Sequence, residues 1–307
     1  MNAEPFGRDL HRPECVHCTA QGDVFVSDWR GGVTRIRPDG TQSLIRGQRP
    51  IQTNGFAILP DGSFLLAHLG EREGGVWRLT LDGTLAPFLE DLPPTNFVHV
   101  SGDKTFITVS TRLVPRTLAR KPGHADGFIV CVDGRGARVV AEGLGYTNEC
   151  KVDPSGKWLY VNETFGKRLS RFRLTEDGLG ERQTQAVFGA GVFPDGLDFD
   201  AEGGVWITSV FSNRLIRVAP DGAQTVVLED NDPQFVARIE GEFARGELVR
   251  DEHPQVPAKL IRNLSSSAFG GEDLRTLYLG CLQDSRIYRM PSPVAGARPP
   301  HWHVRFP

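Results

Sequence analysis

Five side chains that offer carboxylate or amide oxygens recur along this sequence at intervals of 40 to 52 residues: Glu14, Asn54, Asn96, Asn148 and Asp195. Oxygen donors of this kind suit a hard divalent cation, and calcium takes roughly 6 to 8 of them in flexible geometry. Zinc would favour His or Cys, which this set lacks. If the five positions meet in the fold, we expect a divalent metal site, with calcium as first choice and zinc, manganese or magnesium as alternatives.

Each of these residues begins a short β-rich run that is followed by two more runs of the same kind. The third run leads into a tight turn, as residues 76–81 lead into Asp82-Gly83. Asp-Gly between alternating runs is a strong hairpin signal, because both residues tolerate the backbone angles of such turns. The unit occurs six times, the sixth beginning near Ser266 without the Asp-Gly turn. Its shorter spacings match the roughly 40 to 50 residues of a propeller blade.

This repeat predicts an all-β fold, a six-bladed β-propeller formed by residues 1–307 as one domain. A set of β-sandwiches would not place polar residues at the same position in similar units. Equivalent positions of neighbouring blades form a ring, so the divalent metal is expected at one mouth of the central channel. Singly, each Asn or Asp could instead cap its strand. Either the N-terminal segment or residues 301–306 could supply the strand that closes the ring.

Antiparallel geometry adds a second group of residues, because the second strand of each blade must end where the first begins. His68 ends one such strand and is a candidate general base or hydrogen-bond donor. An inert channel histidine is the alternative. Ser110 and Glu163 end two others, and we expect them, with Asn54 and Asn96, to contact the substrate.

Two long insertions are expected at the same mouth. Residues 111–126 form a basic loop, and residues 231–262 contain Phe235, Ile239 and Phe243, whose spacing indicates a short amphipathic helix. Long loops in compact domains are usually binding loops or lids. The two insertions therefore predict a lid over the metal, and the alternative is a solvated loop and a packing helix.

Composition excludes several classes of protein. The 307 residues carry a net charge of -3 without long runs of one sign, which argues against nucleic acid or an anionic membrane as partner. No apolar stretch is long enough for a membrane span, and the N-terminus lacks a signal-peptide core. We therefore expect a cytoplasmic protein whose five cysteines are free thiols. Nothing in the sequence indicates the oligomeric state.

Several stretches together resemble the propeller family of senescence marker protein 30 (SMP-30), gluconolactonase and luciferin-regenerating enzyme. The resemblance covers nearly the whole chain and rests on residues 12–14, Asn96, and residues 146–153, 194–200, 268–271 and 277–278. It implies that Glu14, Asn148 and Asp195 are metal ligands and that Asn96 contacts metal or substrate. Asp195 also matches the family's proposed acid/base.

The resemblance implies a metal-dependent hydrolase, of lactonase or esterase type, acting on a small molecule. A bound cation would polarise the lactone carbonyl, and Asp195 would accept a proton from the attacking water. Sugar lactonases of the family often carry Arg where this chain has Pro94. That departure favours a less polar lactone or another ester-like substrate, with His68 or the basic loop supplying the lost contact. A non-hydrolytic enzyme on the same scaffold, or a calcium-dependent binding or regulatory protein without turnover, stays open.

Overall fold

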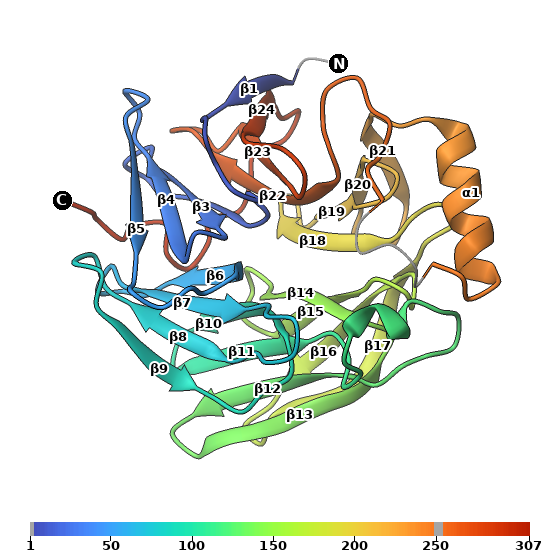
Figure 1. Ribbon diagram of the computed structural model, residues 1–307, viewed down its shortest axis with the longest axis horizontal. Coiled ribbons are helices and arrows are strands. Elements are labelled where there is room, and N and C mark those ends of the chain that lie inside the picture. The colour runs from blue at the N-terminus through green and yellow to red at the C-terminus, as the bar shows by residue number, and fades with distance from the viewer. Residues whose placement is uncertain (1–2, 249–253) are drawn as a thin grey trace.

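The computed structural model describes residues 3–248 and 254–307. Within these residues the strands form six four-stranded antiparallel sheets, arranged as blades around one axis (Figure 1). The predicted all-β six-bladed propeller is therefore confirmed. Residues 249–253 of the expected insertion 231–262 lie outside the described residues.

Each of the first three blades takes four consecutive strands, ordered from the channel outwards. Blade one contains β2 (Val16–Cys18), β3 (Val24–Asp28), β4 (Gly32–Ile36) and β5 (Gln42–Arg46). Blade two contains β6 (Thr53–Ile58), β7 (Phe64–His68), β8 (Val76–Leu79) and β9 (Leu85–Leu89). Blade three contains β10 (Thr95–Ser101), β11 (Lys104–Val109), β12 (Gly127–Asp133) and β13 (Gly136–Leu144).

The next two blades repeat this order, and the sixth borrows a strand from the start of the chain. Blade four contains β14 (Thr147–Val152), β15 (Trp158–Glu163), β16 (Arg168–Leu174) and β17 (Leu179–Val187). Blade five contains β18 (Pro194–Phe199), β19 (Val205–Ser209), β20 (Arg214–Val218) and β21 (Gln224–Glu229). Blade six contains β22 (Leu264–Gly270), β23 (Thr276–Cys281), β24 (Ile287–Pro291) and β1 (Glu4–Phe6).

The N-terminal segment, rather than the C-terminal tail, closes the ring as a strand. Phe6 pairs with Ile287, so β1 is the outer strand of blade six. The C-terminal tail instead packs on the first two blades, where Phe306 contacts the rings of Phe25 and Phe64. The question that the sequence left open is thus settled, and each end of the chain holds the last blade to the first.

The inner strands are buried on both faces because neighbouring blades pack face to face around the channel. All six residues of β14, the innermost strand of blade four, are buried, whereas β17, the outer strand of that blade, has mostly exposed or half-buried residues. Packing is close enough that a Cβ on Gly55 would stand 2.2 Å from the ring of Phe97 in the next blade. A glycine is therefore required where the inner strands of blades two and three meet.

The innermost pair of strands changes register at the first residues of blades two to six. In blade two the shift lies between Thr53 and Phe56, and in blade four between Thr147 and Cys150. Asn54 and Asn148 therefore sit inside these irregularities and are not directly paired with the second strand. A bulge bends its strand and re-aims a side chain, which turns these residues towards the channel mouth.

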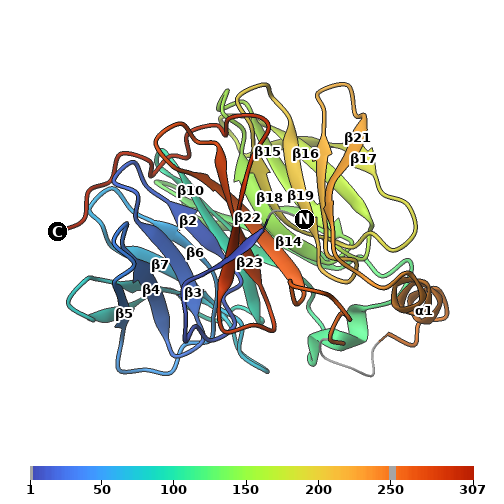
Figure 2. The same cartoon turned by 90° about the horizontal axis from the view of Figure 1, so that it is seen from above.

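Both insertions lie at one end of the channel. The first contains the 3-10 helix η1 (Arg116–Ala119), and the second contains helix α1 (Pro233–Ala244). Asp232 caps the N-terminus of the predicted helix, where its side chain accepts hydrogen bonds from the backbone N–H groups of Gln234 and Phe235. Figure 2 shows η1 beside α1 at the same end of the molecule. No helix in the described part of the chain has the length and apolar character needed to cross a membrane.

Candidate functional site

Four of the predicted ring residues line a single pocket at the channel mouth. They are Glu14, Asn96, Asn148 and Asp195. Each is at least nine-tenths buried, and each comes from the start of a different inner strand. The structure thus brings together, from four blades, the residues for which a metal-binding role was expected.

One side of the pocket is a hydrogen-bonded group of three residues. Arg12 donates from Nη1 to the carboxylate of Glu14 and, over 2.7 Å, to Oδ1 of Asn54. Asn54 in turn donates from Nδ2 to Glu14 Oε1 (2.8 Å) and to the backbone oxygen of Asn96 (3.0 Å). Asn54 does not line the pocket itself. It holds Glu14 and Asn96 at a fixed separation.

The amide oxygens of Asn96 and Asn148 are buried without a hydrogen-bond partner. The Nδ2 group of Asn148 donates to Oγ1 of Thr164 (3.1 Å), which fixes the amide and leaves Oδ1 as its other polar atom. A buried polar atom without a partner costs about 1–3 kcal/mol. A ligand that accepts lone pairs from both amide oxygens would supply the partner that each of them lacks.

The two carboxylates of the pocket repel each other. Burial raises the pKa of Asp195 well above its usual range, and the charges of Glu14 and Glu149 raise it further, while Arg12 opposes them. The backbone of Asp195 is held from blade four, where Asn162 Nδ2 donates to its oxygen over 2.9 Å. A divalent cation at this position would offset the repulsion.

These observations fit a divalent cation held by oxygen atoms. The pocket supplies two carboxylates and two amide oxygens, which suits calcium, magnesium or manganese better than zinc. No cluster of three or more His, Cys, Asp or Glu residues suitable for a metal occurs among residues 3–248 and 254–307. A cation bound in this pocket would contact the amides as well as the carboxylates.

His68 is not among the residues that line the pocket. Its Nδ1 accepts a hydrogen bond from the backbone N–H of Gln52 (3.0 Å), and its ring packs edge-on against Trp77. Burial lowers its pKa, and the charge of Glu73 opposes that change. The structure therefore gives His68 a contact that holds its own blade together.

Ser110 and Glu163 also point away from the pocket. Ser110 donates to the backbone oxygen of Thr147 (2.9 Å), which joins blade three to blade four. The carboxylate of Glu163 accepts hydrogen bonds from Arg168 and from the backbone of Gly145. Both residues lie at the ends of second strands, as expected. Glu163 pairs with Thr147, and Val109, just before Ser110, pairs with Thr95. In each blade the register shift follows directly after that pair. The side chain of Ser110 therefore lies between two blades, whereas that of Glu163 is bound within blade four and by the segment that leads into it.

Two further pocket residues, Arg12 and Tyr146, lie two positions before Glu14 and Asn148. Both have left-handed backbone angles, with φ of 50° and 68°. Such angles are uncommon outside glycine and cluster at functional sites. The guanidinium of Arg12 lies 4.2 Å from the centre of the Trp29 ring. The repeated offset of two residues was the signal in the sequence that could have identified this pair.

The insertions cover the pocket. Arg116 and Arg120, from residues 111–126, line it, and Arg116 donates from Nη1 to the Tyr146 hydroxyl (3.2 Å). An apolar cluster joins Ala119 of η1 to Ile239 and Phe243 of α1 and to residues of the inner strand ends. Both insertions thus pack over the mouth that holds Glu14 and Asp195.

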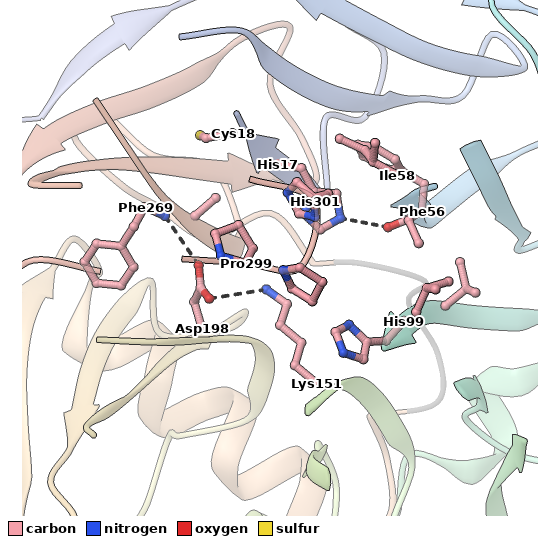
Figure 3. Close-up of a pocket in the computed structure, with 15 residues that line it drawn as sticks. His17, Cys18, Phe56, Ile58, His99, Lys151, Asp198, Phe269, Pro299 and His301 are labelled. Carbon is pink, nitrogen blue, oxygen red and sulfur yellow. Dashed lines mark hydrogen bonds and ion pairs between the residues drawn. The ribbon is translucent and has the colours of Figure 1, made fainter. Parts of the chain in front are cut away.

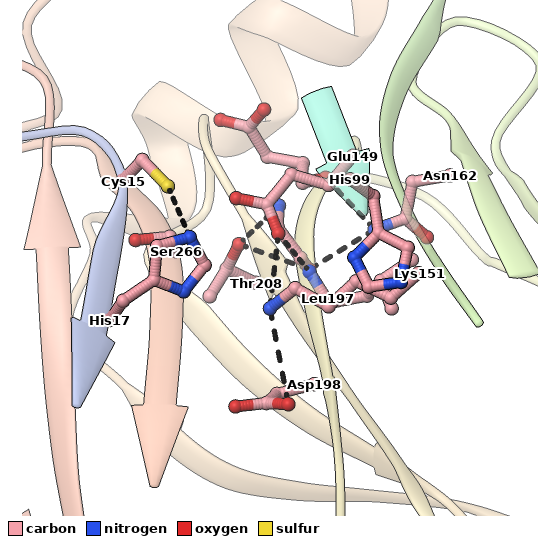
Figure 4. A network of polar contacts seen from close by, with 12 residues as sticks. Cys15, His17, His99, Glu149, Lys151, Asn162, Leu197, Asp198, Thr208 and Ser266 are labelled. Atoms are coloured by element: carbon pink, nitrogen blue, oxygen red, sulfur yellow. Dashed lines mark hydrogen bonds and ion pairs between the residues drawn. The ribbon is translucent and has the colours of Figure 1, made fainter. Parts of the chain in front are cut away.

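The opposite end of the channel holds a different polar group, farther along the same inner strands. Lys151 Nζ lies 3.7 Å from Glu149 and 3.9 Å from Asp198, between the two carboxylates (Figure 4). Asp198 also accepts from the backbone N–H of Phe269 (Figure 3). His301 of the C-terminal tail covers this group.

The cysteines are not among the residues that line the pocket. All five are free and buried, as expected from the sequence. Burial raises the pKa of the Cys18 thiol above its ordinary value. The Sγ atom of Cys15 lies 3.7 Å from Nε2 of His17, whose Nε2 is also 2.8 Å from the Phe56 backbone oxygen. Cys15 and Cys18 thus serve packing.

Comparison with known proteins gives one family and several relatives. Residues 115–231 match the model of the SMP-30/Gluconolactonase/LRE-like region. A 6-deoxy-6-sulfogluconolactonase from Pseudomonas putida is 29% identical over 261 residues, which are 83% of this chain and 77% of that protein.

Solved structures share the fold. A gluconolactonase from Xanthomonas campestris has a TM-score of 0.67 at 20% identity, covering 93% of this chain and 88% of that one. A calcium-binding protein, regucalcin, from Agrobacterium tumefaciens has a TM-score of 0.70 at 17% identity, covering 100% and 98%. The resemblance expected from the sequence is thereby confirmed: residues 115–231 match the model of that family, and solved structures of a gluconolactonase and of a luciferin-regenerating enzyme share the fold.

Proposed function

We propose that this protein is a metal-dependent lactonase. The observation that carries the proposal is the convergence of Glu14, Asn148 and Asp195 on one pocket where amide oxygens are buried without partners. The name of the Pseudomonas putida relative, a sulfogluconolactonase, supports a lactone as substrate. The same comparison supports hydrolysis as the reaction.

Glu14, Asn148 and Asp195 would hold the cation, with Asn96 next to it or on the substrate. When bound, a divalent cation there would polarise the lactone carbonyl and stabilise the negative charge that develops on its oxygen. We propose calcium first, with magnesium, manganese or zinc as alternatives.

Asp195 would act as the general base. Its second carboxylate oxygen would take a proton from water as that water forms a bond to the carbonyl carbon. The bond from that carbon to the ring oxygen then breaks, and the ring oxygen takes up the proton. The product is a hydroxy acid. Arg12 and Asn54 would keep Glu14 oriented through the hydrogen bonds described above.

The two insertions would act as a lid. Their apolar cluster, which includes Ala119 and Phe243, packs over the pocket and would limit the access of water once substrate is bound. Of the residues proposed for substrate contact, Asn96 lines the pocket, whereas Asn54 would act by supporting Glu14.

A pH-indicator assay tests this proposal. Sugar, aliphatic and aromatic lactones would be offered to protein stripped of metal and to protein restored with calcium, zinc, manganese or magnesium. We expect acid release that depends on the metal. Stoichiometric metal binding without release from any lactone would instead favour a binding role or another reaction.

A further inference from the structure

Thr164 lies where blades four and five meet, directly after β15 and beside two of the proposed metal ligands. Its side chain lines the pocket, and the residue is 3% exposed. Its backbone N–H donates to the oxygen of Tyr146 over 3.0 Å, which fixes the residue against the start of blade four. The proposed lactonase mechanism does not use this residue.

The hydroxyl of Thr164 makes two hydrogen bonds, one to each blade. Its Oγ1 donates to the backbone oxygen of Pro194 (2.8 Å), the residue directly before Asp195. Nδ2 of Asn148 donates to the same Oγ1 (3.1 Å). A hydroxyl has a single hydrogen, and a carbonyl oxygen can only accept. Because the hydrogen is used on Pro194, the hydroxyl can only accept from Asn148.

This arrangement determines which end of the Asn148 amide faces Thr164. If the amide oxygen stood there, it would meet a lone pair of the hydroxyl, and neither atom could donate. The amide therefore turns its nitrogen to Thr164, and its buried oxygen is left without a protein partner. A cation needs this orientation, because only the oxygen of an amide is a ligand for calcium or magnesium.

Asp195 is the other partner of the Asn148 side chain. Burial raises the pKa of Asp195, and a hydrogen bond with Asn148 is among the smaller effects that lower it. Both side chains are proposed ligands, so a carboxylate oxygen that binds the cation is less available to the amide. The hydrogen bond to Thr164 uses the amide nitrogen, which no cation binds, and it can persist when the site is loaded.

We propose that Thr164 is a positioning residue of the metal site: its hydroxyl turns the amide oxygen of Asn148 towards the cation and joins that ligand to the segment before Asp195. This inference rests on the metal site of the proposed function, and it adds a residue that does not touch the cation. Partners that orient metal ligands typically contribute about 10–100-fold in metal affinity.

Calorimetric titration of metal-free protein with calcium tests the inference. Thr164→Val keeps the branched shape of the side chain and removes the hydroxyl, and its Kd should rise by about tenfold or more. Thr164→Ser keeps the hydroxyl, so its Kd should stay close to the wild-type value. Magnesium, manganese and zinc are titrated in the same way, and the variants are compared with the cation that wild-type protein binds most tightly.

Thr34→Val is the matched control. Thr34, on β4, is 2% exposed, and its hydroxyl donates to Asp28 over 3.1 Å, but it does not line the pocket. Both valine variants lose a buried hydrogen bond, and urea denaturation of the metal-free proteins measures what each loses in stability. Only Thr164→Val should weaken metal binding. Equal metal affinity in the two valine variants would overturn the inference.

A carboxylate in place of the amide separates orientation of the ligand from support of the strand. Asn148→Asp presents an oxygen whichever way the group is turned, so Thr164→Val should change Kd much less in this background. An undiminished loss there would show that the hydroxyl acts through the backbone of Pro194, and would overturn the role at Asn148. If Asn148→Asp does not fold or bind metal, the serine variant decides, because weak binding by both Thr164→Ser and Thr164→Val would also overturn it.

Failure of the lactonase proposal is recognised separately. Metal binding without hydrolysis of any lactone, together with the loss in Thr164→Val, would reject the reaction and support the positioning role. Hydrolysis that depends on the metal, with unchanged affinity in Thr164→Val, would reject the positioning role alone. Wild-type protein that binds none of the four cations would reject both.

Discussion

The two ends of the channel are built from the same inner strands and differ in how their charges are satisfied. At the mouth covered by the two insertions, Glu14 and Asp195 repel each other, and two amide oxygens have no partner. At the opposite end, Lys151 lies between Glu149 and Asp198. The comparison indicates that the first end is shaped for a ligand, whereas the second is held together by its own residues.

The histidines reinforce this contrast. His99 at the opposite end accepts a hydrogen bond from the backbone N–H of Val152 (3.1 Å), and burial, with a smaller effect from Lys151, lowers its pKa to about 3. It is therefore neutral near pH 7. The residues that line the pocket at the covered mouth include no histidine. One end of the channel thus offers oxygen ligands, and the other holds neutral rings and an internal ion pair.

The largest expected effect separates Asp195 from Asp198, which lie three positions apart on β18. Asp195→Asn should lower kcat by about 10³-fold, because the base that accepts the proton of water is lost. Asp198→Asn should retain most of the activity and lose stability instead, because Lys151 loses a partner. Kinetics and chemical denaturation of both variants provide the measurement. Comparable loss of activity in the two would contradict the assignment of separate roles.

Replacement of Lys151 tests the opposite end directly. Lys151→Met should lower the free energy of unfolding by about 3 kcal/mol or more, since two buried carboxylates lose their common partner. Lys157→Met, at an exposed position six residues later, is the control and should change it little. Urea denaturation measures both. A loss below about 1 kcal/mol would show that the ion pair contributes little to the fold.

Much of the fold was predictable because blades repeat a local pattern. The six units, the ring of oxygen-bearing residues and the helix around Ile239 follow from alternation, turn chemistry and a period of four residues. These features depend on neighbours in the sequence. The strand that closes the ring was not predictable, because Glu4 and Arg289 pair across 285 positions.

The second group of predicted site residues shows where such reasoning stops. His68 and Glu163 do end strands at the expected mouth, but the register shifts beside Asn54 and Asn148 turn their side chains away from the pocket. The reach of Arg116 over the pocket also depends on the path of the insertion, which has no repeat to guide it.

Metal binding should stabilise the protein through the covered mouth alone. At a free calcium concentration about 100-fold above Kd, the free energy of unfolding should rise by about 2.7 kcal/mol. Asn148→Ala should abolish most of this gain, because it removes an amide oxygen that has no protein partner. Asp198→Asn should keep the gain despite its lower starting stability. Differential scanning calorimetry with and without chelator measures the shift, and a shift that survives in Asn148→Ala would place the metal elsewhere.

The smallest expected effect concerns acid and the tail residue His301. Burial lowers its pKa to about 3, and Lys151 adds to that effect. Because the unfolded chain binds a proton on this ring near pH 6.5 and the folded chain does not, stability should be present above that pH and fall as the pH drops towards 3. Between pH 7 and pH 5 this residue alone should account for a loss of about 2 kcal/mol.

His301→Gln should remove that share of the acid sensitivity, and His303→Gln should not, because the side chain of His303 is exposed. Urea denaturation at the two pH values measures the difference. The groups that face His301 are Lys151, His99 and His17. The ring of His17 contacts the ring of His301, with 4.6 Å between the two ring centres. If His301→Gln leaves the acid sensitivity intact, the protons are taken up by His17 or His99 when the chain unfolds. If the sensitivity disappears in the His303 variant instead, the tail is not held over the channel as the structure describes.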